Sequence, residues 1–298
     1  MGRGAVALGR RLRAADIYCR RLVLRRQPYL LVGLCIVIAS FILVLGTVLY
    51  DHGRARNVRD EKLNILTALL PPYVDRHGRG YERDIILAAL APRYREDQVE
   101  FFVQPFTRHW SSFLSDDRYQ AVTTVPEGLA LNGYQSVSYV SYQNGISYRM
   151  SAFPDGLDGE DFAALAGHRI VAFGGASRIL SGLSDHVGSF ALYVEEKRQS
   201  VHSSLLDRQI VDAVIADGAI LFAYNQQFVA DNVRADMAFA PFACATPYHM
   251  VFRDAELQAF FDQGIARLRA SGRLQAMERR FISENGLDEI GYRVRRCG

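Results

Sequence analysis

An uninterrupted apolar run at residues 29–50, YLLVGLCIVIASFILVLGTVLY, constrains the fold of this chain more than any other feature. A helix rises ~1.5 Å per residue, so a helix of this length would cross the ~30 Å hydrocarbon core of a bilayer. Arginines crowd residues 1–28, where Asp16 is the one acid, whereas residues 51–61 carry balanced charge. The positive-inside rule then predicts a cytoplasmic basic arm (1–28), a transmembrane helix (29–50) and an exported remainder that begins with a linker (51–61).

The apolar run has two other interpretations. A cleaved signal peptide has a shorter apolar region and a small-residue cleavage site, whereas this run ends in Tyr50, Asp51 and His52. A buried core helix is the second alternative, but the adjacent arginine cluster argues against it. We therefore expect a single-pass protein of the bacterial inner membrane, with its N-terminus in the cytoplasm and its C-terminal domain in the periplasm.

Composition limits what the exported part can be. About 240 residues follow the anchor, enough for one large or two modest domains. The chain is 49% hydrophobic and 22% charged, as in ordinary globular proteins, and the arm accounts for its net charge of +3, so no nucleic-acid partner is expected. Histidines are scattered singly and no CxxC pair exists, so we expect no metal and no cofactor. Cys244 and Cys297 both fall in the exported part, and whether they pair is left open.

Apolar segments of strand length alternate with helical spacings along the exported part. Residues 63–70 are mostly apolar and end at two prolines, and the segment that follows repeats apolar residues with a helical period. Such alternation predicts a sheet covered by helices, and hence an α/β fold. The predicted elements are a strand at 63–70, a helix at 81–94, a strand at 99–103, a helix at 110–116, a strand at 119–122, and two C-terminal helices separated by Gly272 in the left-handed conformation.

The order of these segments resembles the family 3 periplasmic solute-binding proteins, the polar amino-acid binders of ABC importers. The resemblance runs collinearly over residues 63–283. It is carried by the Pro71-Pro72-Tyr73 turn, Gly80-Tyr81 with Asp84, Trp110, the strand at Tyr119-Gln120-Ala121, the joint at residues 165–177, the segment 206–224, and the closing helices from Arg253 to Phe281.

The resemblance implies a two-lobed, periplasmic-binding-protein-like (type II) fold, preceded by the transmembrane helix. Two α/β lobes joined by paired crossings leave a crevice at the carboxyl ends of their strands and close on a ligand like a hinge. The expected parts are lobe 1 at 62–140 and 245–285, lobe 2 at 141–244, and a C-terminal tail at 286–298.

Three residues in the second lobe match the family's ligand contacts. Gly175 and Ser177 lie between a strand and a helix, where exposed amides and the helix dipole favour a carboxylate; the alternative is a plain turn with Ser177 as a helix cap. Asp217 follows an apolar strand, and the matching acid of amino-acid binders holds the ligand's ammonium group. Asp217 as a helix cap is again the alternative.

The remaining site residues come from the resemblance, and one expected residue is missing. Amino-acid binders carry an arginine after the third strand as a bidentate carboxylate clamp, and Gly128 stands at that position. A standard α-amino-acid ligand is therefore less favoured, whereas Asp217 still favours a ligand that carries an amine. The other predicted ligand-binding residues are Tyr73, Trp110, Thr123, Thr124 and Tyr142, although aromatic residues taken alone more often serve packing.

The sequence predicts a membrane-anchored periplasmic solute-binding protein without catalytic activity. It would capture a small polar, amine-bearing or amino-acid-like ligand between its lobes, and would either deliver it to an ABC permease or report it to a membrane sensor partner. Two alternatives come from other classes: an enzyme on the same fold, similar to cyclohexadienyl dehydratases, with Glu127 as a candidate acid, and a scaffold that has kept the fold and lost its pocket.

Overall fold

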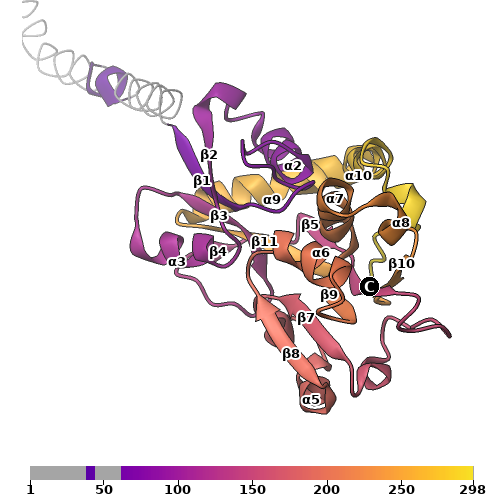
Figure 1. Ribbon diagram of the computed structural model, residues 1–298. Coiled ribbons are helices and arrows are strands. Elements are labelled where there is room, and N and C mark those ends of the chain that lie inside the picture. The colour runs from indigo at the N-terminus through magenta and orange to yellow at the C-terminus, as the bar shows by residue number, and fades with distance from the viewer. Residues whose placement is uncertain (1–37, 44–61, 298) are drawn as a thin grey trace, which may run out of the picture. The chain divides into compact units, whose positions relative to one another are not determined.

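The computed structural model describes residues 38–43 and 62–297 (Figure 1). The chain divides into two units, 1–61 and 62–298. The predicted membrane span lies outside the described residues except for residues 38–43, which are helical. Over the two described ranges, no helix has the length and apolar character that crossing a membrane requires. The anchor therefore stays a prediction.

The first sheet joins strands from the start of the described chain to one long strand from near its end. Its six strands are β1 (Leu63–Ala68), β2 (Val99–Gln104), β3 (Ala121–Pro126), β4 (Tyr134–Gln135), β5 (Val140–Tyr142) and β11 (Thr246–Phe252). β1 pairs in parallel with β2 and β3, and β11 runs antiparallel to β3, β4 and β5. The helices α2 (Tyr81–Leu90), α3 (Arg108–Ser115), α9 (Ala255–Ala270) and α10 (Arg273–Glu284) belong to this part, which we call lobe 1.

The second sheet forms lobe 2 and is also mixed (Figure 1). Its strands, in spatial order, are β10 (Met237–Pro241), β6 (Asn144–Arg149), β9 (Ala213–Asp217), β7 (Arg169–Phe173) and β8 (Leu192–Glu196). β7 is parallel to β8 and β9, whereas β6 is antiparallel to β9 and β10. The helices of lobe 2 are α4 (Ala176–Ile179), α5 (Leu183–His186), α6 (Ser200–Asp207), α7 (Gly218–Phe228) and α8 (Asp231–Arg234). Mixed sheets in two lobes are the expected α/β architecture.

Most elements of lobe 1 lie close to where the sequence predicts them. The third strand is an exception, because β3 begins at Ala121 rather than Tyr119 and continues to Pro126, with all six residues buried. Gly272 has φ 69°, as predicted, and separates α9 from α10. Gly264 explains the close crossing of α9 over α2, since a Cβ there would lie 2.3 Å from the Ala89 carbonyl oxygen.

The chain crosses between the lobes twice, directly after β5 and between β10 and β11. Gln143 lies at the first crossing and is fully buried. Its Nε2 donates a hydrogen bond of 2.8 Å to the carbonyl oxygen of Phe242 at the second crossing. The lobes also contact each other directly, because the rings of Phe106 and Phe173 lie 6.1 Å apart, and one hydrophobic cluster spans both lobes. The structure is therefore a closed arrangement of the two lobes.

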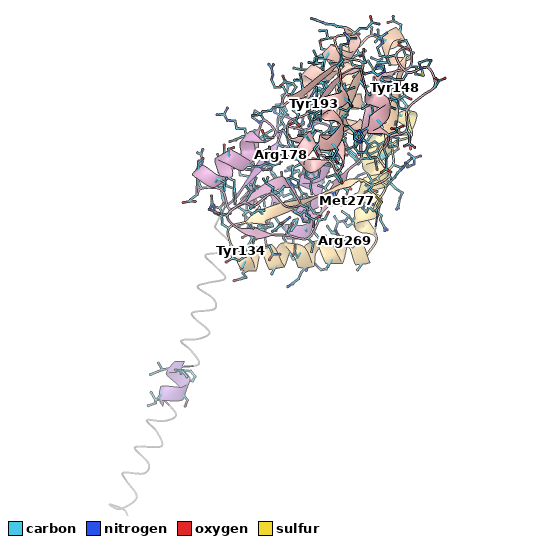
Figure 2. All side chains as sticks on the ribbon, turned by 90° about the horizontal axis from the view of Figure 1, so that it is seen from below. Tyr134, Tyr148, Arg178, Tyr193, Arg269 and Met277 are labelled. Carbon is cyan, nitrogen blue, oxygen red and sulfur yellow. A yellow bond between two sulfur atoms is a disulfide. The ribbon has the colours of Figure 1, made fainter. Side chains whose placement is uncertain are left out.

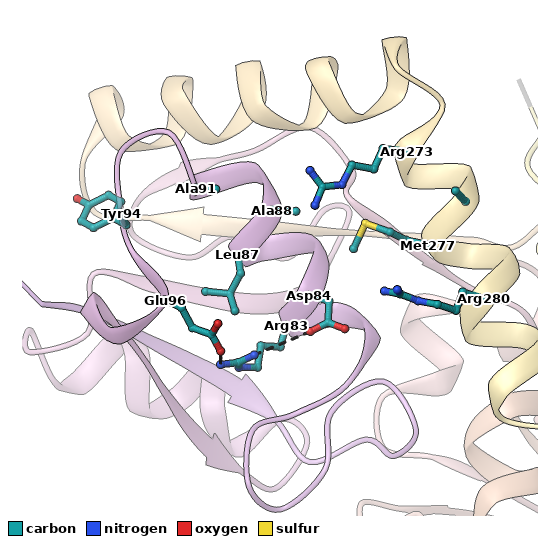
Figure 3. A pocket seen from close by; sticks show the side chains of 11 residues that line it. Arg83, Asp84, Leu87, Ala88, Ala91, Tyr94, Glu96, Arg273, Met277 and Arg280 are labelled. Carbon is teal, nitrogen blue, oxygen red and sulfur yellow. Dashed lines mark hydrogen bonds and ion pairs between the residues drawn. The ribbon is translucent and has the colours of Figure 1, made fainter.

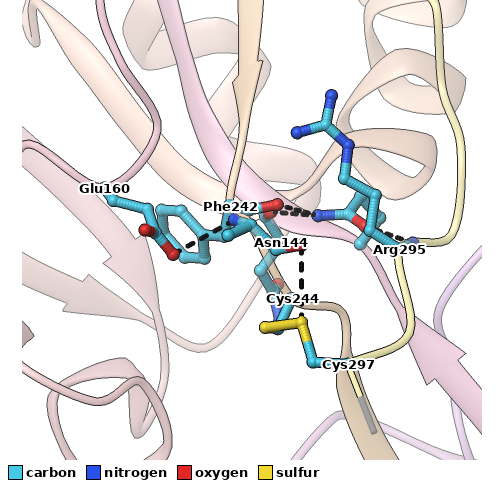
Figure 4. Close-up of a disulfide and its surroundings, with 8 residues drawn as sticks. Asn144, Glu160, Phe242, Cys244, Arg295 and Cys297 are labelled. Atoms are coloured by element: carbon cyan, nitrogen blue, oxygen red, sulfur yellow. Dashed lines mark hydrogen bonds between the residues drawn. A yellow bond between two sulfur atoms is a disulfide. The ribbon is translucent and has the colours of Figure 1, made fainter.

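The segment after α10 returns to the crossings and is held there. It forms a short 3₁₀ helix, η4 (Leu287–Ile290), and then runs to a disulfide between Cys297 and Cys244, with the two Cα atoms 5.5 Å apart (Figure 4). The backbone amide of Arg295 donates to Gln143 Oε1 at 2.9 Å. The pairing that the sequence left open is thus present, and it fastens the tail beside the second crossing.

Candidate functional site

Asp217 lies where lobe 2 meets lobe 1, at the end of β9. Its Oδ1 accepts a hydrogen bond of 2.9 Å from the amide of Ile220, so Asp217 caps α7, as the structural alternative proposed. Its Oδ2 accepts from the hydroxyls of Tyr73 at 3.1 Å and Tyr292 at 3.0 Å. The carboxyl is 2% exposed. The side chain that was expected to bind a ligand's ammonium group is therefore fully partnered by the protein itself.

Asp217, Tyr73 and Tyr292, which we call the Asp217 cluster, form a closed triangle of oxygens. The two hydroxyl oxygens lie 2.5 Å apart. The triangle therefore has three oxygen–oxygen contacts, but the two tyrosines supply only two protons for them. Burial raises the pKa of Asp217 to about 7, and hydrogen bonds from Ile220 and the tyrosines oppose that shift. A protonated Asp217 would supply the third proton. The cluster joins lobe 1, lobe 2 and the tail, because each member comes from a different one of these parts.

A second buried carboxylate, Glu82, organises the lobe 1 side of the same region. Its Oε1 accepts from Thr124 Oγ1 at 2.8 Å and from the Tyr139 hydroxyl, and its Oε2 accepts from the Tyr142 hydroxyl at 3.0 Å. Glu82 is fully buried, and burial raises its pKa to about 7 against the effect of these hydrogen bonds. We call these four residues the Glu82 cluster. The ring of Tyr142 stacks on Tyr73 with centroids 4.1 Å apart, which connects the two clusters.

Almost no free space remains between these clusters. The cavity that Asp217 and Tyr142 help to line measures about 10 Å³. A volume of that size accommodates about one water molecule. The polar residues Asn144 and Gln199 also line it, and Gln199 Oε1 is buried without a hydrogen-bond partner in the described part of the chain. In this closed form the deepest part of the crevice has no room for a ligand.

The joint after β7 also holds a group of the protein's own. Glu195 accepts hydrogen bonds from the amides of Gly175 at 2.7 Å and Ser177 at 2.9 Å, and from the Tyr193 hydroxyl at 3.0 Å. Partial burial opposes ionisation of Glu195, but these hydrogen bonds outweigh it and lower its pKa. The joint amides, which were expected to bind a ligand's carboxylate, thus bind the side-chain carboxylate of Glu195 instead. Gly175, not Ser177, occupies the cap position of α4, so Ser177 is not the helix cap that the structural alternative proposed.

A ligand-sized cavity of about 390 Å³ lies beside this joint, between the two lobes. Figure 2 labels Arg178, which borders it, where lobe 2 faces lobe 1. We call it the Trp110 cavity. Lobe 1 contributes Thr107, Trp110, Ser111, Leu114, Leu129, Ala130 and Leu131, and lobe 2 contributes Gly174, Gly175, Arg178, Glu195 and Lys197.

Two backbone features adjoin the Trp110 cavity. Thr107 has φ 69° and ψ −32°, a conformation that costs a non-glycine residue of order 1–3 kcal/mol and that often marks a functional site. Gly128 has φ 79°, and a Cβ there would meet nothing within 4 Å. The position of the family's arginine clamp is therefore an open turn without a side chain.

The eight predicted site residues are divided among three places. Trp110 and Gly175 line the Trp110 cavity, with Ser177 hydrogen-bonded to its wall, whereas Tyr73, Tyr142 and Asp217 lie in the packed region. Thr123 and Thr124 are fully buried in lobe 1, where Thr123 Oγ1 donates to Thr67 Oγ1 at 3.0 Å. These residues remain predictions as ligand contacts.

A further hollow of about 600 Å³ lies on lobe 1 alone, between α2 and α10 (Figure 3). Arg83, Arg273 and Arg280 border it together with Met277. Arg83 is paired with Glu96 at 2.6 Å. No residue of lobe 2 lines this hollow, so hinge closure would not enclose a molecule bound there.

Sequence reasoning missed Glu82, Glu195 and Tyr292. Glu82 could have been found, because it shares a helical face with Ile85 and Ala89, where a charged residue is unusual. Tyr292 follows the end of the family resemblance, and no local pattern shows that it reaches Asp217. Glu195 likewise meets Ser177 only through the pairing of β7 with β8.

Comparison with known proteins supports the fold. A scan of protein-family models and a search of curated proteins find no match. Among solved structures, the chain is similar to a histidine kinase sensor domain described as similar to periplasmic binding proteins, with 18% identity and a TM-score of 0.59 over 75% of this chain and 97% of that one. An ancestral arginine-binding protein bound to arginine has 19% identity and a TM-score of 0.59 over 74% and 97%.

A third similar structure comes from work on glutathione import via GshT and the cystine ABC importer TcyBC of Streptococcus mutans. It has 14% identity and a TM-score of 0.59 over 75% of this chain and 95% of that one. At these identities the comparisons show a fold, the two-lobed α/β periplasmic-binding-protein type, and not a ligand.

Proposed function

We propose that this protein is a membrane-anchored solute-binding module that captures a small molecule between its two lobes. The observation that carries the proposal is the Trp110 cavity, about 390 Å³ and lined by both lobes. Its size falls within the usual range of ligand pockets, ~300–1,000 Å³. Because a molecule seated there would touch lobe 1 and lobe 2 together, its binding would favour the closed arrangement over an open one.

The membrane anchor at residues 29–50 forms the second part of the proposal. The arginine excess before it supports an orientation in the bacterial inner membrane with the basic arm in the cytoplasm and the module in the periplasm. A tethered module would act locally, either by passing its ligand to an ABC permease or by reporting its presence to a membrane sensor partner. Protease added to spheroplasts should cleave residues 62–297 while the basic arm stays protected. Protection of both parts would contradict this topology.

A ligand-free scaffold is the second candidate function, and a specific observation favours it. The groups expected to bind an amino acid are engaged internally, Asp217 by two tyrosines and the joint amides by Glu195. The enzyme alternative lacks such support. Glu127, its candidate acid, is exposed and does not line the Trp110 cavity.

Mass spectrometry of small molecules released from the purified full-length chain tests the proposal. Ser111→Phe should block the Trp110 cavity, because Ser111 is an exposed residue of its wall. Ser115→Phe is the matched control, since Ser115 is exposed one turn further along α3 and does not line the cavity. A molecule retained by the wild type and Ser115→Phe but not by Ser111→Phe supports the proposal.

The same three proteins separate the binding module from the scaffold. A ligand at 100 times its dissociation constant adds ~2.7 kcal/mol to the free energy of unfolding, which a thermal melting screen detects. The scaffold alternative predicts no retained molecule and the same melting temperature in every ligand mixture for all three proteins. That result would overturn the proposed function.

A further inference from the structure

The two walls of the Trp110 cavity differ in chemical character. The lobe 1 wall contains no charged residue and presents Trp110 and three leucines. The lobe 2 wall carries Arg178 and Lys197, both exposed, together with Glu195. A molecule that contacts both walls would therefore place an apolar group against lobe 1 and a charged group against lobe 2.

The charges on the lobe 2 wall favour an anion. Glu195 keeps its negative charge, but its oxygens already accept hydrogen bonds from the two joint amides and the Tyr193 hydroxyl. Arg178 and Lys197, by contrast, make no side-chain hydrogen bond or ion pair within residues 62–297. Two unpaired cations beside one fully engaged carboxylate leave a positive potential at this wall.

The groups that would recognise a zwitterionic amino acid are not free at this site. Asp217 does not line the Trp110 cavity and is bound by the hydroxyls of Tyr73 and Tyr292. Gly128 occupies the position at which the family resemblance expects an arginine, so no arginine there can bind an α-carboxylate. An ammonium group would find the cations Arg178 and Lys197 instead of a free acid, which costs binding energy.

We infer that the ligand of the Trp110 cavity is a small anion with an apolar body, of the arylacetate class, rather than an amino acid. The inference rests on the proposed function, because it assigns a ligand class to the same cavity. The aromatic body packs on Trp110 and the leucines of lobe 1. The carboxylate accepts charge-assisted hydrogen bonds from Arg178 and Lys197.

Trp110 provides a direct readout of this site. It is the only tryptophan of the chain, and its Nε1 is buried without a hydrogen-bond partner among the described residues. Indole emission responds to a change in its surroundings, so a molecule that enters the cavity reports its own binding. The Trp110→Phe variant lacks this emission and controls for ligand fluorescence.

The experiment titrates the full-length chain in detergent micelles with four compounds that share one phenyl ring. They are phenylacetate, 2-phenylacetamide, 2-phenylethylamine and L-phenylalanine, and Trp110 emission is followed. Phenylacetate should bind saturably and at least tenfold more tightly than the other three, because it alone is a net anion. Its affinity should fall as salt is added, since exposed charges are screened.

Matched variants then assign the contacts. Arg178→Ala/Lys197→Ala should weaken phenylacetate binding at least tenfold, since it removes both charge-assisted donors. Arg198→Ala, the control, should bind within twofold of the wild type, because Arg198 pairs with Glu196 outside the cavity. Asp217→Asn should also bind within twofold.

Three outcomes would overturn the inference: tighter binding of the amine or the amino acid, phenylacetate affinity that depends on Asp217 but not on the double variant, or no saturable response to any compound. Each leaves the proposed function standing if the co-purification experiment with Ser111→Phe retains its result. The failure of the ligand class and the failure of the binding module are therefore distinguishable.

Discussion

The Asp217 cluster and the Trp110 cavity lie at the same boundary between the lobes but differ in how their polar groups are satisfied. In the Asp217 cluster every carboxyl oxygen has a partner from the chain. In the Trp110 cavity, the side chains of Arg178 and Lys197 border free space and make no hydrogen bond or ion pair within residues 62–297. Buried polar groups that are partnered contribute to stability, whereas unpartnered groups at a cavity are available to a ligand.

This difference separates residues that hold the lobes together from residues that contact a ligand. The family resemblance assigns Asp217 to the ligand, but its partners in this chain are Tyr73 and Tyr292. Substitutions in the clusters should therefore lower the free energy of unfolding and spare binding in the Trp110 cavity. Substitutions at the wall of the Trp110 cavity should weaken binding and leave the free energy of unfolding almost unchanged.

The largest expected effect is that of Glu82→Ala. The change leaves three buried hydroxyl donors without their acceptor and opens a cavity in lobe 1. We expect a loss of about 3–5 kcal/mol in the free energy of unfolding, measured by denaturant titration. Glu96→Ala is the control. Its exposed carboxylate pairs with Arg83, so it should cost no more than about 1 kcal/mol, and equal losses in both variants would contradict the role of Glu82.

The pH dependence of stability tests Asp217. Its pKa rises from 3.8 in the unfolded chain to about 7 in the folded one, so the folded state holds the extra proton between these values. Stability from this group is present below pH 4 and is lost as the pH rises to about 7. The side chain of Asp217→Asn does not titrate. The free energy of unfolding of this variant minus that of the wild type should therefore increase by up to about 4 kcal/mol from pH 4 to pH 8. A constant difference between the two proteins would show that Asp217 is ionised throughout.

Loss of the disulfide should lower the free energy of unfolding slightly less than these changes do. Cys244 and Cys297 are 53 residues apart in sequence, so their bond restricts a long loop of the unfolded chain and holds the tail that carries Tyr292. Cys244→Ser/Cys297→Ser should lose about 2–4 kcal/mol, measured as a lower denaturant midpoint. Reductant should lower the midpoint of the wild type and leave that of the double variant unchanged. If reductant left the denaturant midpoint of the wild type unchanged, the disulfide would not stabilise the fold.

The smallest effect on stability is expected at the cavity wall. Arg178→Ala removes an exposed side chain without an ion pair among the described residues and should change the free energy of unfolding by less than about 0.5 kcal/mol. Arg149→Ala is the contrast within lobe 2. Arg149 is mostly buried and pairs with Asp236 at 3.0 Å, so its loss should cost about 1–3 kcal/mol. If Arg178→Ala were the more destabilising variant, the division between the two regions would fail.

Much of the fold could be predicted from local patterns, and the exceptions have physical causes. Apolar runs placed β1 and β2, and the helical period placed α2 and α9, because burial of one face leaves a periodic trace in the sequence. The start of β3 was predicted two residues too early, because Tyr119 is a buried aromatic residue like those of a strand but does not join the strand. Asp217 was predicted at the end of a strand, where it lies, but its partners could not be predicted.

The amino-acid sequence by itself determined the alternating α/β elements, the apolar run at residues 29–50 and the absence of an arginine at Gly128. Each of these is a property of neighbouring residues, which periodicity, length and residue type express directly. Only the tertiary structure decided that Tyr292 binds Asp217, that Glu195 occupies the joint amides and that Trp110 borders the free space. These contacts join residues that are far apart in sequence, and the packing of the two lobes, rather than any local pattern, brings them together.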